Sequence, residues 1–521
     1  MLDINALHDS RAWPHPTGPV TLCETHISWV FLTGDYAYKI KKPVDFGFLD
    51  FSTLDKRKHF CDEEVRLNRR LAPEIYLDVV PICGDPHSPR VGGEGPVLEF
   101  AVRMRQFDPD MSFDRMLLRG ELHAAHMRLA AETLAGFHAD IAVAPDNSDF
   151  GAPQQVCRPV IENFDTLHQE IEPLLDDAEL KAHIAELEAW SLNANRTLAE
   201  TLRQRREQGF IRECHGDLHL RNILYWQQAV IPFDCLEFDP QLRWIDVMSE
   251  LAFLLMDLDD HQRPDLARQL LDAYLALTGD FSGLHVLRYY KVYRALVRAK
   301  VAGLRLAQLS GEDDRRAEAA AVGNYLRLAV RYTRPSRGRL IITHGLSASG
   351  KSWLSQQLLE QTDLIRIRSD VERKRLFGLA PNQASGSGTD QGIYSADATA
   401  KTYARLLQVA DSLMDAGIWV LVDATFLRQA DRQAFSDCAA AKHTPFAILH
   451  CTAPPDTLRE RIVARQQQGA DASEADLAIL ERQLRKQEPL NPQELRHCVT
   501  LDARDELNPR DILRRLASVD P

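Results

Sequence analysis

The chain has 521 residues, of which 26% are charged and 45% are hydrophobic. This composition is typical of a folded globular protein and excludes a chain that is mainly disordered, collagen-like or coiled coil. At ~150 residues per domain, the length predicts three or four domain-sized pieces. The formal net charge of -13 excludes an overall positive field for non-specific binding of nucleic acid, so any such contact would be local.

The nine cysteines are scattered and never spaced as CxxC, which predicts neither a disulfide framework nor a zinc site. Residues 1–19 lack a basic segment followed by an apolar stretch. The longest apolar runs, such as residues 251–256, are far too short to cross a membrane. We therefore expect a soluble, cytoplasmic protein without a membrane partner.

The chain begins with strand patterns. Residues 27–32 and 36–44 predict two strands of a hairpin, and residues 97–107 predict another strand with alternating character. Between them, Ser52 followed by Asp55 signals the start of a helix. These elements predict a small lobe that is rich in strands.

The pattern then becomes mostly helical from residue 116 to residue 330, with an interruption at residues 213–238 that predicts a loop between short strands. The first domain is thus predicted to be an α+β fold with two lobes. The small lobe spans about residues 20–107 and the helical lobe about residues 108–330.

A domain boundary is predicted near residue 336. The basic segment 331–338 contains proline and glycine and is followed at once by an apolar strand pattern at residues 340–344. We therefore predict a first domain over residues 1–336 and a second over residues 337–521. In the second domain strand patterns alternate with helices, which predicts an α/β fold with a parallel sheet.

The segment Gly345–Ser352 reads GLSASGKS and matches GxxxxGK[ST], directly after an apolar strand and directly before a helix. In this pattern backbone N–H groups and the helix N-terminus hold phosphate oxygens, the lysine reaches the β- and γ-phosphates, and the last hydroxyl binds Mg²⁺. The sequence therefore predicts a site for ATP and Mg²⁺. Its residues are Gly345, Ser349, Gly350, Lys351 and Ser352.

Two carboxylates follow this motif at the ends of apolar strands. Asp423 ends the run 419–423 and can complete the Mg²⁺ site, although a carboxylate that only caps a strand end is the alternative. Asp370 precedes a helix that carries Arg373 one turn later. Asp370 is placed either to deprotonate an acceptor hydroxyl or to cap this helix beside a surface arginine, and the residues alone leave both readings open.

Arg461 and Arg465 lie four residues apart on one face of a predicted helix. A lid helix of this kind can close over ATP and neutralise charge on the transferred phosphoryl group, whereas solvated arginines are the alternative. Residues 340–505 resemble the P-loop small-molecule and polynucleotide-kinase-like group, often named AAA-type kinases, which is similar to zeta toxins, gluconate kinases and 5′-polynucleotide kinases. The resemblance implies phosphoryl transfer, with Asp370 as the base and Arg465 as the lid arginine.

In the first domain, the segment His215–Asn222 reads HGDLHLRN. Phosphoryl transfer needs a carboxylate beside the acceptor hydroxyl and oxygen ligands for Mg²⁺. Asp217 can supply the first, and Asn222 can supply part of the second. Asp234 follows at the end of the short strand 229–233, and we expect the three side chains to meet around one metal cluster.

This segment resembles the aminoglycoside and choline phosphotransferase family, a branch of the protein-kinase-like fold, and the likeness extends over about residues 20–330. The resemblance implies a two-lobe protein-kinase-like domain in which Asp217 is the catalytic base. It also implies that Asn222 and Asp234 are Mg²⁺ ligands, and Asp246 matches the structural aspartate of the family.

In the small lobe, Lys39 matches the lysine of the family's third strand, and Glu64 on the following helix is its expected partner at the nucleotide. The residues leave three alternatives open, namely Glu63, Lys41 and Lys42. No GxGxxG precedes Lys39, and the segment 24–28 stands in its place. This segment offers hydroxyl, imidazole and backbone donors but lacks the glycines that let a backbone approach phosphate closely.

Both sets of kinase residues are intact, which predicts an enzyme with two sites that use ATP and Mg²⁺ to phosphorylate hydroxyl groups of small molecules. The first alternative is a non-catalytic N-terminal binding module that regulates one active C-terminal kinase. The second is a toxin or a 5′-kinase of nucleic-acid ends, for which the basic residues between Arg366 and Arg375 would form a local patch. The acidic charge balance favours small acceptors.

Overall fold

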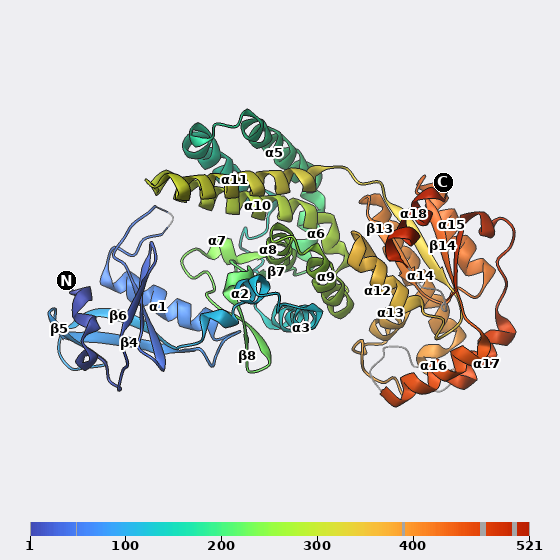
Figure 1. Ribbon diagram of the computed structural model, residues 1–521, viewed down its shortest axis with the longest axis horizontal. Helices are drawn as coiled ribbons and strands as arrows, with labels where there is room; N and C mark the ends of the chain where they lie inside the picture. Colours follow the sequence, from blue (N-terminus) through green and yellow to red (C-terminus); the bar gives the residue numbers. More distant parts are fainter. Residues whose placement is uncertain (1, 48, 388–390, 469–475, 503–507, 520–521) are drawn as a thin grey trace. The chain divides into compact units, whose positions relative to one another are not determined.

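The computed structural model describes residues 2–47, 49–387, 391–468, 476–502 and 508–519. For residues 465–468 it describes the backbone alone. The chain forms two compact units (Figure 1). The first contains Met1–Asp257 and Tyr289–Leu326, and the second contains Leu258–Arg288 and Arg327–Pro521. No helix of the described residues is long and apolar enough to cross a membrane.

The first unit opens with an antiparallel six-stranded sheet of order β1-β2-β3-β6-β4-β5. Its strands are β1 (Thr21–Glu24), β2 (Ser28–Leu32), β3 (Tyr36–Lys41), β4 (Tyr76–Asp85), β5 (Ser88–Val91) and β6 (Val97–Arg105). Helix α1 (Leu54–Asn68) packs against β4 and β6, where Cys61 and Val65 join Val102 in one core (Figure 1). The helix is capped by Thr53, whose hydroxyl accepts the N–H of Lys56, so the cap predicted at Ser52 is wrong by one residue.

The rest of the first unit is mainly helical. Its helices are α2 (Phe113–Leu118), α3 (Ala124–Asp140), α4 (Pro153–Thr166), α5 (Ala178–Thr197), α6 (Ala199–Glu207), α7 (Pro240–Arg243), α8 (Val247–Asp260), α10 (Leu284–Gln308) and α11 (Glu312–Thr333), of which the last three continue past the limits of the unit. Two short antiparallel pairs lie among them, β7 (Ile211–Glu213) with β10 (Trp244–Asp246) and β8 (Ile223–Trp226) with β9 (Ala229–Pro232). The prediction of a strand-rich lobe followed by a helical lobe is confirmed.

The second unit is built on a parallel five-stranded sheet of order β12-β13-β11-β14-β15. Its strands are β11 (Arg339–His344), β12 (Leu364–Arg368), β13 (Trp419–Asp423), β14 (Phe446–Thr452) and β15 (Cys498–Asp502). Its helices after β11 are α12 (Lys351–Gln361), α13 (Ser369–Leu376), α14 (Ala396–Asp415), α15 (Gln429–Ala441), α16 (Pro455–Gln468), α17 (Leu477–Lys486) and α18 (Pro509–Ser518). The predicted α/β fold with a parallel sheet is confirmed.

Helices cover both faces of this sheet because alternate residues of its buried strands point to opposite sides. Ile341 packs with residues of α12 and α18, whereas Leu340 and Ile342 pack with residues of α14 and α15. Strand β11 has β13 on one side and β14 on the other, so the direction of winding reverses there. Ligands of such sheets bind at the carboxyl ends of the strands beside this reversal, which is where the P-loop leaves β11.

Helix α9 (Pro264–Thr278) also belongs to the second unit, although it precedes α10 in the chain (Figure 1). Leu275 of this helix shares a core with Leu340 and Ile342 of β11, and Phe281 and Leu284 extend that core. A segment well before residue 336 therefore completes the core under the P-loop sheet. The domain boundary near residue 336 stays a prediction.

Candidate active sites

Two lysines of β3 meet one glutamate of α1. Residues 39 and 41 lie on the same face of the strand because side chains alternate along it. The ammonium group of Lys39 lies 2.8 Å from Glu64 Oε1, and that of Lys41 lies 2.7 Å from Glu64 Oε2. Lys39 also reaches Asp234, whose Oδ1 lies 2.7 Å from the same ammonium group. The structure therefore joins three residues that the sequence assigned to nucleotide and metal.

The alternatives to this pair have other partners. Glu63 accepts hydrogen bonds from Arg66 at 2.9 Å, and Lys42 donates to Glu24 Oε1 at 2.6 Å. Lys41 is fully buried and pairs with Glu237 in addition to Glu64. Lys39 is the lysine that spans Glu64 and Asp234, and its place at the nucleotide stays a prediction.

Glu64 and Lys39 are both ionised at neutral pH. Burial alone would raise the pKa of Glu64, but the ammonium groups of Lys39 and Lys41 outweigh it and lower the pKa to about 2. Burial would lower the pKa of Lys39, yet Asp234, Glu64 and Glu237 raise it well above its ordinary value. Each of these two buried charged groups is thus paired with an opposite charge, which offsets the free-energy cost of removing it from water.

The predicted catalytic loop lies between β7 and β8. The side-chain amide of Asn222 donates to the backbone carbonyl of Asp217 at 3.0 Å and to its Oδ2 at 3.2 Å. The backbone carbonyl of Asn222 accepts the N–H of Phe233 at 2.9 Å, which fixes the neighbouring Asp234 beside the loop. Asp234 has a φ of 63°, a left-handed conformation that is strained for a residue other than glycine. The loop thus brings together the three predicted residues, whose oxygens are the ligands that Mg²⁺ prefers.

Asp217 remains open to a substrate, since 39% of its side chain is exposed. His219 Nε2 lies 3.4 Å from Asp217 Oδ2. Burial would raise the pKa of this carboxyl group, but His219, His215 and Arg294 lower it below its ordinary range. Asp217 is therefore ionised at neutral pH, as a base that accepts a hydroxyl proton must be.

Glu250 of α8 is a site residue that sequence reasoning missed. Its Oε2 accepts the N–H groups of His215 at 2.6 Å and Gly216 at 2.8 Å, and its Oε1 lies 3.0 Å from His138 Nε2. This buried carboxylate holds the catalytic loop, whereas Asp246, the matched structural aspartate, pairs with Arg205. The available signal was a single glutamate beside the apolar run of residues 251–256.

The P-loop of the second unit has the backbone that its motif predicts. Gly345 has a φ of +147°, and a side chain there would collide with the carbonyl oxygen of Cys451. Gly350, at the start of α12, has a φ of 95°. Ser349 Oγ is buried without a hydrogen-bond partner among the described residues. This unpartnered hydroxyl, in a loop whose shape depends on glycine, fits a phosphate group. Lys351 lies at the end of the same loop, and its Nζ donates to the Leu346 carbonyl at 2.7 Å.

Asp423 and Ser352 are joined through Ser355, one turn later on α12. The hydroxyl of Ser355 lies 3.0 Å from the carbonyl oxygen of Ser352 and 3.3 Å from Asp423 Oδ2. Asp423 is buried at the end of β13, directly beside the strand that carries the P-loop. A serine hydroxyl and a carboxylate in this position fit the oxygen shell of Mg²⁺.

The remaining predicted residues lie around this loop. Asp370 is in the first turn of α13, directly after strand β12. Strand β12 pairs with β13, and Arg368 at its end lies opposite Asp423. Arg373 donates to the carbonyl of Ile393 at 2.8 Å and thereby holds a neighbouring segment. Arg461 of α16 donates to the carbonyl of Ala348 at 3.3 Å and so reaches the P-loop. The side chain of Arg465 lies outside the described residues.

Gln483 of α17 is a further residue that the sequence did not single out. Its side-chain oxygen accepts the N–H of Ser347 at 2.8 Å. A backbone donor of the P-loop, of the kind that binds phosphate, is thus engaged by a helix that follows α16. Helices α16 and α17 pack over this loop, because Leu458 of α16 and Leu480 of α17 share a core with Leu346 of the loop.

Two protein-family models match this chain, one in each half. The model described as the phosphotransferase enzyme family matches residues 53–290, which include the catalytic loop and Glu64. The model described as an AAA domain matches residues 340–490, which include the P-loop and Asp423. Fold and sites therefore define a phosphotransferase with two kinase-like domains.

Two relatives align with this chain over most of its length. Proteins of Mycobacterium tuberculosis and Mycobacterium bovis, which carry only the description "uncharacterized protein", are 30% identical to this chain over 457 residues. The matched region covers 88% of this chain and 88% of each relative. The chain belongs to the family of these mycobacterial proteins.

Solved structures resemble the chain in part. A putative kinase from Chloroflexus aurantiacus is 21% identical, and the match covers 36% of this chain and 100% of that one with a TM-score of 0.30. A choline/ethanolamine kinase family protein from Mesorhizobium loti is 16% identical, and the match covers 61% of this chain and 92% of that one with a TM-score of 0.37.

Proposed function

We propose that both domains are kinases that use ATP and Mg²⁺ to transfer the γ-phosphate to hydroxyl groups of small molecules. The observation that carries the proposal is the Lys39–Glu64 ion pair at 2.8 Å with Asp234 on the same ammonium group. In protein-kinase-like enzymes this lysine–glutamate pair must be in place for phosphoryl transfer. A domain that only binds a ligand does not require this arrangement, in which the ammonium group of Lys39 pairs with both Glu64 and Asp234.

In the first domain, Asp217 accepts the proton of the acceptor hydroxyl, since it is ionised and exposed. Asn222 and Asp234 would hold Mg²⁺, which neutralises charge on the nucleotide phosphates when it is bound. Lys39 exchanges its contact with Asp234 for a phosphate oxygen and stays oriented by Glu64. Glu250 keeps the backbone of the loop in place while the proton moves.

In the second domain, the P-loop N–H groups and Lys351 bind the phosphates, while Ser352 and Asp423 would hold Mg²⁺. Asp370 takes the proton of the second acceptor. Arg461 and Arg465 neutralise charge on the transferred group. Positioning and charge neutralisation supply most of the rate in such reactions, so these side chains suffice without a covalent step.

One observation favours the alternative that the first domain only binds a ligand. The turn between β1 and β2 lacks glycines, and Thr25 Oγ1 accepts the N–H of Ser28 at 2.9 Å instead of leaving it for phosphate. Lys42 ties the same turn to Glu24 at 2.6 Å. This alternative predicts that ATP binds to the second domain alone.

The basic residues near Asp370 support small acceptors over nucleic-acid ends. Arg366 pairs with Asp272, and Arg375 donates to the carbonyls of residues 275–277 at the end of α9. Arg373 holds the Ile393 carbonyl. Because these cations have partners within the chain, they do not form a solvated patch for a polyanion.

Labelled ATP tests the proposal on the full chain, with sugars, amino alcohols, nucleosides and 5′-hydroxyl oligonucleotides as acceptors. Lys351→Ala and Asp217→Ala should each remove a different part of the Mg²⁺-dependent transfer, and the double variant should remove all of it. If Asp217→Ala leaves every transfer reaction unchanged, the first domain is not a kinase and the regulatory alternative holds. If only oligonucleotides are phosphorylated, small acceptors are excluded.

A further inference from the structure

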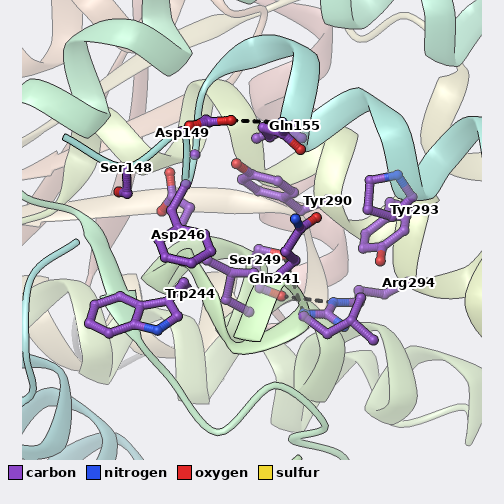
Figure 2. A pocket seen from close by; sticks show the side chains of 16 residues that line it. Ser148, Asp149, Gln155, Gln241, Trp244, Asp246, Ser249, Tyr290, Tyr293 and Arg294 are labelled. Carbon is purple, nitrogen blue, oxygen red and sulfur yellow. Dashed lines mark hydrogen bonds between the residues drawn. The ribbon is translucent and has the colours of Figure 1, made fainter. Parts of the chain in front are cut away.

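A pocket of about 250 Å³ lies in the helical part of the first unit (Figure 2). Its walls come from residues 148–159 around the start of α4, from residues 241–249 and from residues 290–294 of α10. The residues assigned above to nucleotide, Mg²⁺ and proton transfer are not among those that line it. Since one water molecule needs roughly 10–15 Å³ of such space, the pocket has room for a small organic molecule.

Two buried polar groups in the wall lack partners. Tyr290 is 3% exposed, and its hydroxyl has no hydrogen-bond partner among the described residues. The side-chain oxygen of Gln155 also has none, while its amide donates to Asp149 Oδ2 at 3.3 Å (Figure 2). Buried polar groups are almost always satisfied, because an unpaired one costs stability. One donor and acceptor from Tyr290 and one acceptor from Gln155 are thus available to a ligand.

The buried charges of the wall already have partners. Asp246 accepts hydrogen bonds from Arg205 at 2.6 and 2.8 Å, and Arg294 donates to the carbonyls of Gly216 and Ser249 at 3.2 Å each. A cationic ligand would face the guanidinium group of Arg294, and an anionic one would face the carboxylates of Asp149 and Asp246. The wall thus carries charges of both signs and, at Asp246 and Arg294, offers no uncompensated buried charge to a charged ligand, which favours a neutral one.

Aromatic side chains supply the apolar part of the wall. The rings of Phe150 and Trp244 stack with their centroids 5.5 Å apart and their planes at 10°. Tyr290 and Tyr293 lie across the pocket from Trp244 (Figure 2). Flat apolar faces combined with a few hydroxyl and amide partners suit a ring that carries hydroxyl groups, such as a monosaccharide or a cyclitol.

We propose that this pocket binds a neutral hydroxylated ring compound, whose hydroxyl groups pair with the Tyr290 hydroxyl and the Gln155 side-chain oxygen. The pocket adjoins the catalytic loop through Arg294, which donates to the Gly216 carbonyl one residue before Asp217. Binding requires neither ATP nor turnover, so this site stands or falls independently of the proposed kinase activity.

Calorimetric titration of the full chain without ATP tests the proposal, with myo-inositol and D-glucose as neutral probes. Glucose 6-phosphate and choline are the charged counterparts. At least one neutral probe should bind and raise the unfolding temperature, and each charged counterpart should bind at least about tenfold more weakly. The proposal is overturned if neither neutral probe binds, or if a charged counterpart binds equally well.

Variants then place the bound probe in this pocket. Tyr290→Phe keeps the packing of the ring and removes the unpartnered hydroxyl, so it should weaken binding about tenfold and leave the ligand-free unfolding temperature unchanged or higher. Tyr289→Phe is the matched control, because this neighbouring hydroxyl bonds to Asn195 at 3.4 Å and does not line the pocket. Val156→Trp, which fills the pocket, should abolish binding. Wild-type affinity in both Tyr290→Phe and Val156→Trp would refute the site.

Discussion

Asp272 of α9 accepts two hydrogen bonds from the guanidinium group of Arg366 on β12, at 3.1 and 2.6 Å, although 94 residues separate them in the sequence. Arg366 also donates to Ser355 Oγ at 3.3 Å, and Ser355 contacts Asp423. Helix α9 thereby orients Asp423, the carboxylate predicted to bind Mg²⁺ in the P-loop domain. This helix lies within the region that the phosphotransferase model matches.

Asp272→Ala should destabilise the second unit by about 3 kcal/mol, because it leaves the largely buried guanidinium group of Arg366 without its counter-charge. It should also lower the Mg²⁺-dependent transfer that Lys351→Ala removes. Asp363→Ala is the matched control, since this carboxylate pairs with Arg268 but is 89% exposed and contributes less than about 1 kcal/mol. Urea unfolding of both variants measures the difference, and equal midpoints would show that the Asp272 pair is not stabilising.

A fragment that starts at residue 337 should be less stable than the same unit in the full chain by several kcal/mol. It lacks Leu275, Phe281 and Leu284, whose burial completes one face of the sheet. Exposed apolar surface should also make the fragment aggregate. Cooperative unfolding of the fragment at the midpoint of the intact unit would contradict the role of α9.

Glu64→Gln should lower the free energy of unfolding at pH 7 on the order of 3 kcal/mol, because the pKa of Glu64 falls from 4.5 to about 2 on folding. A pKa that is lower in the folded state stabilises the protein above pH 4.5, and this contribution is lost as the pH falls toward 2. The difference between variant and wild type should therefore shrink between these values. Glu63→Gln, on the same helix but paired with the half-exposed Arg66, should cost much less.

Glu250→Ala should destabilise the first unit by about 3 kcal/mol and abolish the transfer that depends on Asp217. The substitution leaves two N–H groups of the catalytic loop and the buried His138 without their acceptor. Glu250→Gln keeps one oxygen for the N–H groups and should recover part of both losses. Unchanged activity of Glu250→Ala would mean that the loop holds its shape without this carboxylate.

Asp370→Asn should reduce the transfer rate of the second domain at least about 100-fold and leave nucleotide affinity nearly unchanged, as expected for a general base. Single-turnover rates and nucleotide titrations of the same preparation separate the two effects. Parallel losses in rate and affinity would instead assign Asp370 to the structure of α13.

The motifs were readable from the sequence because the geometry that they need is local. Gly345 to Ser352 form one loop between a strand and a helix, and the bond between Asn222 and Asp217 spans five residues. The alternation of strands and helices likewise predicted the α/β class of the second domain, and the strands followed by a helical run predicted the α+β class of the first. Strands β1, β4, β5, β8 and β15 were missed, because short or irregular strands carry little periodicity.

The sequence by itself thus determined two kinase-like domains and their order, and it predicted the residue types of each site. Only the tertiary structure decided that Glu64 serves two lysines, that Glu250 rather than Asp246 holds the catalytic loop, and that α9 completes the P-loop unit. Residues 35 positions apart, such as Glu250 and His215, meet because helices and sheets pack by burying their apolar faces. No local sequence pattern indicates which buried carboxylate accepts a hydrogen bond from which N–H group.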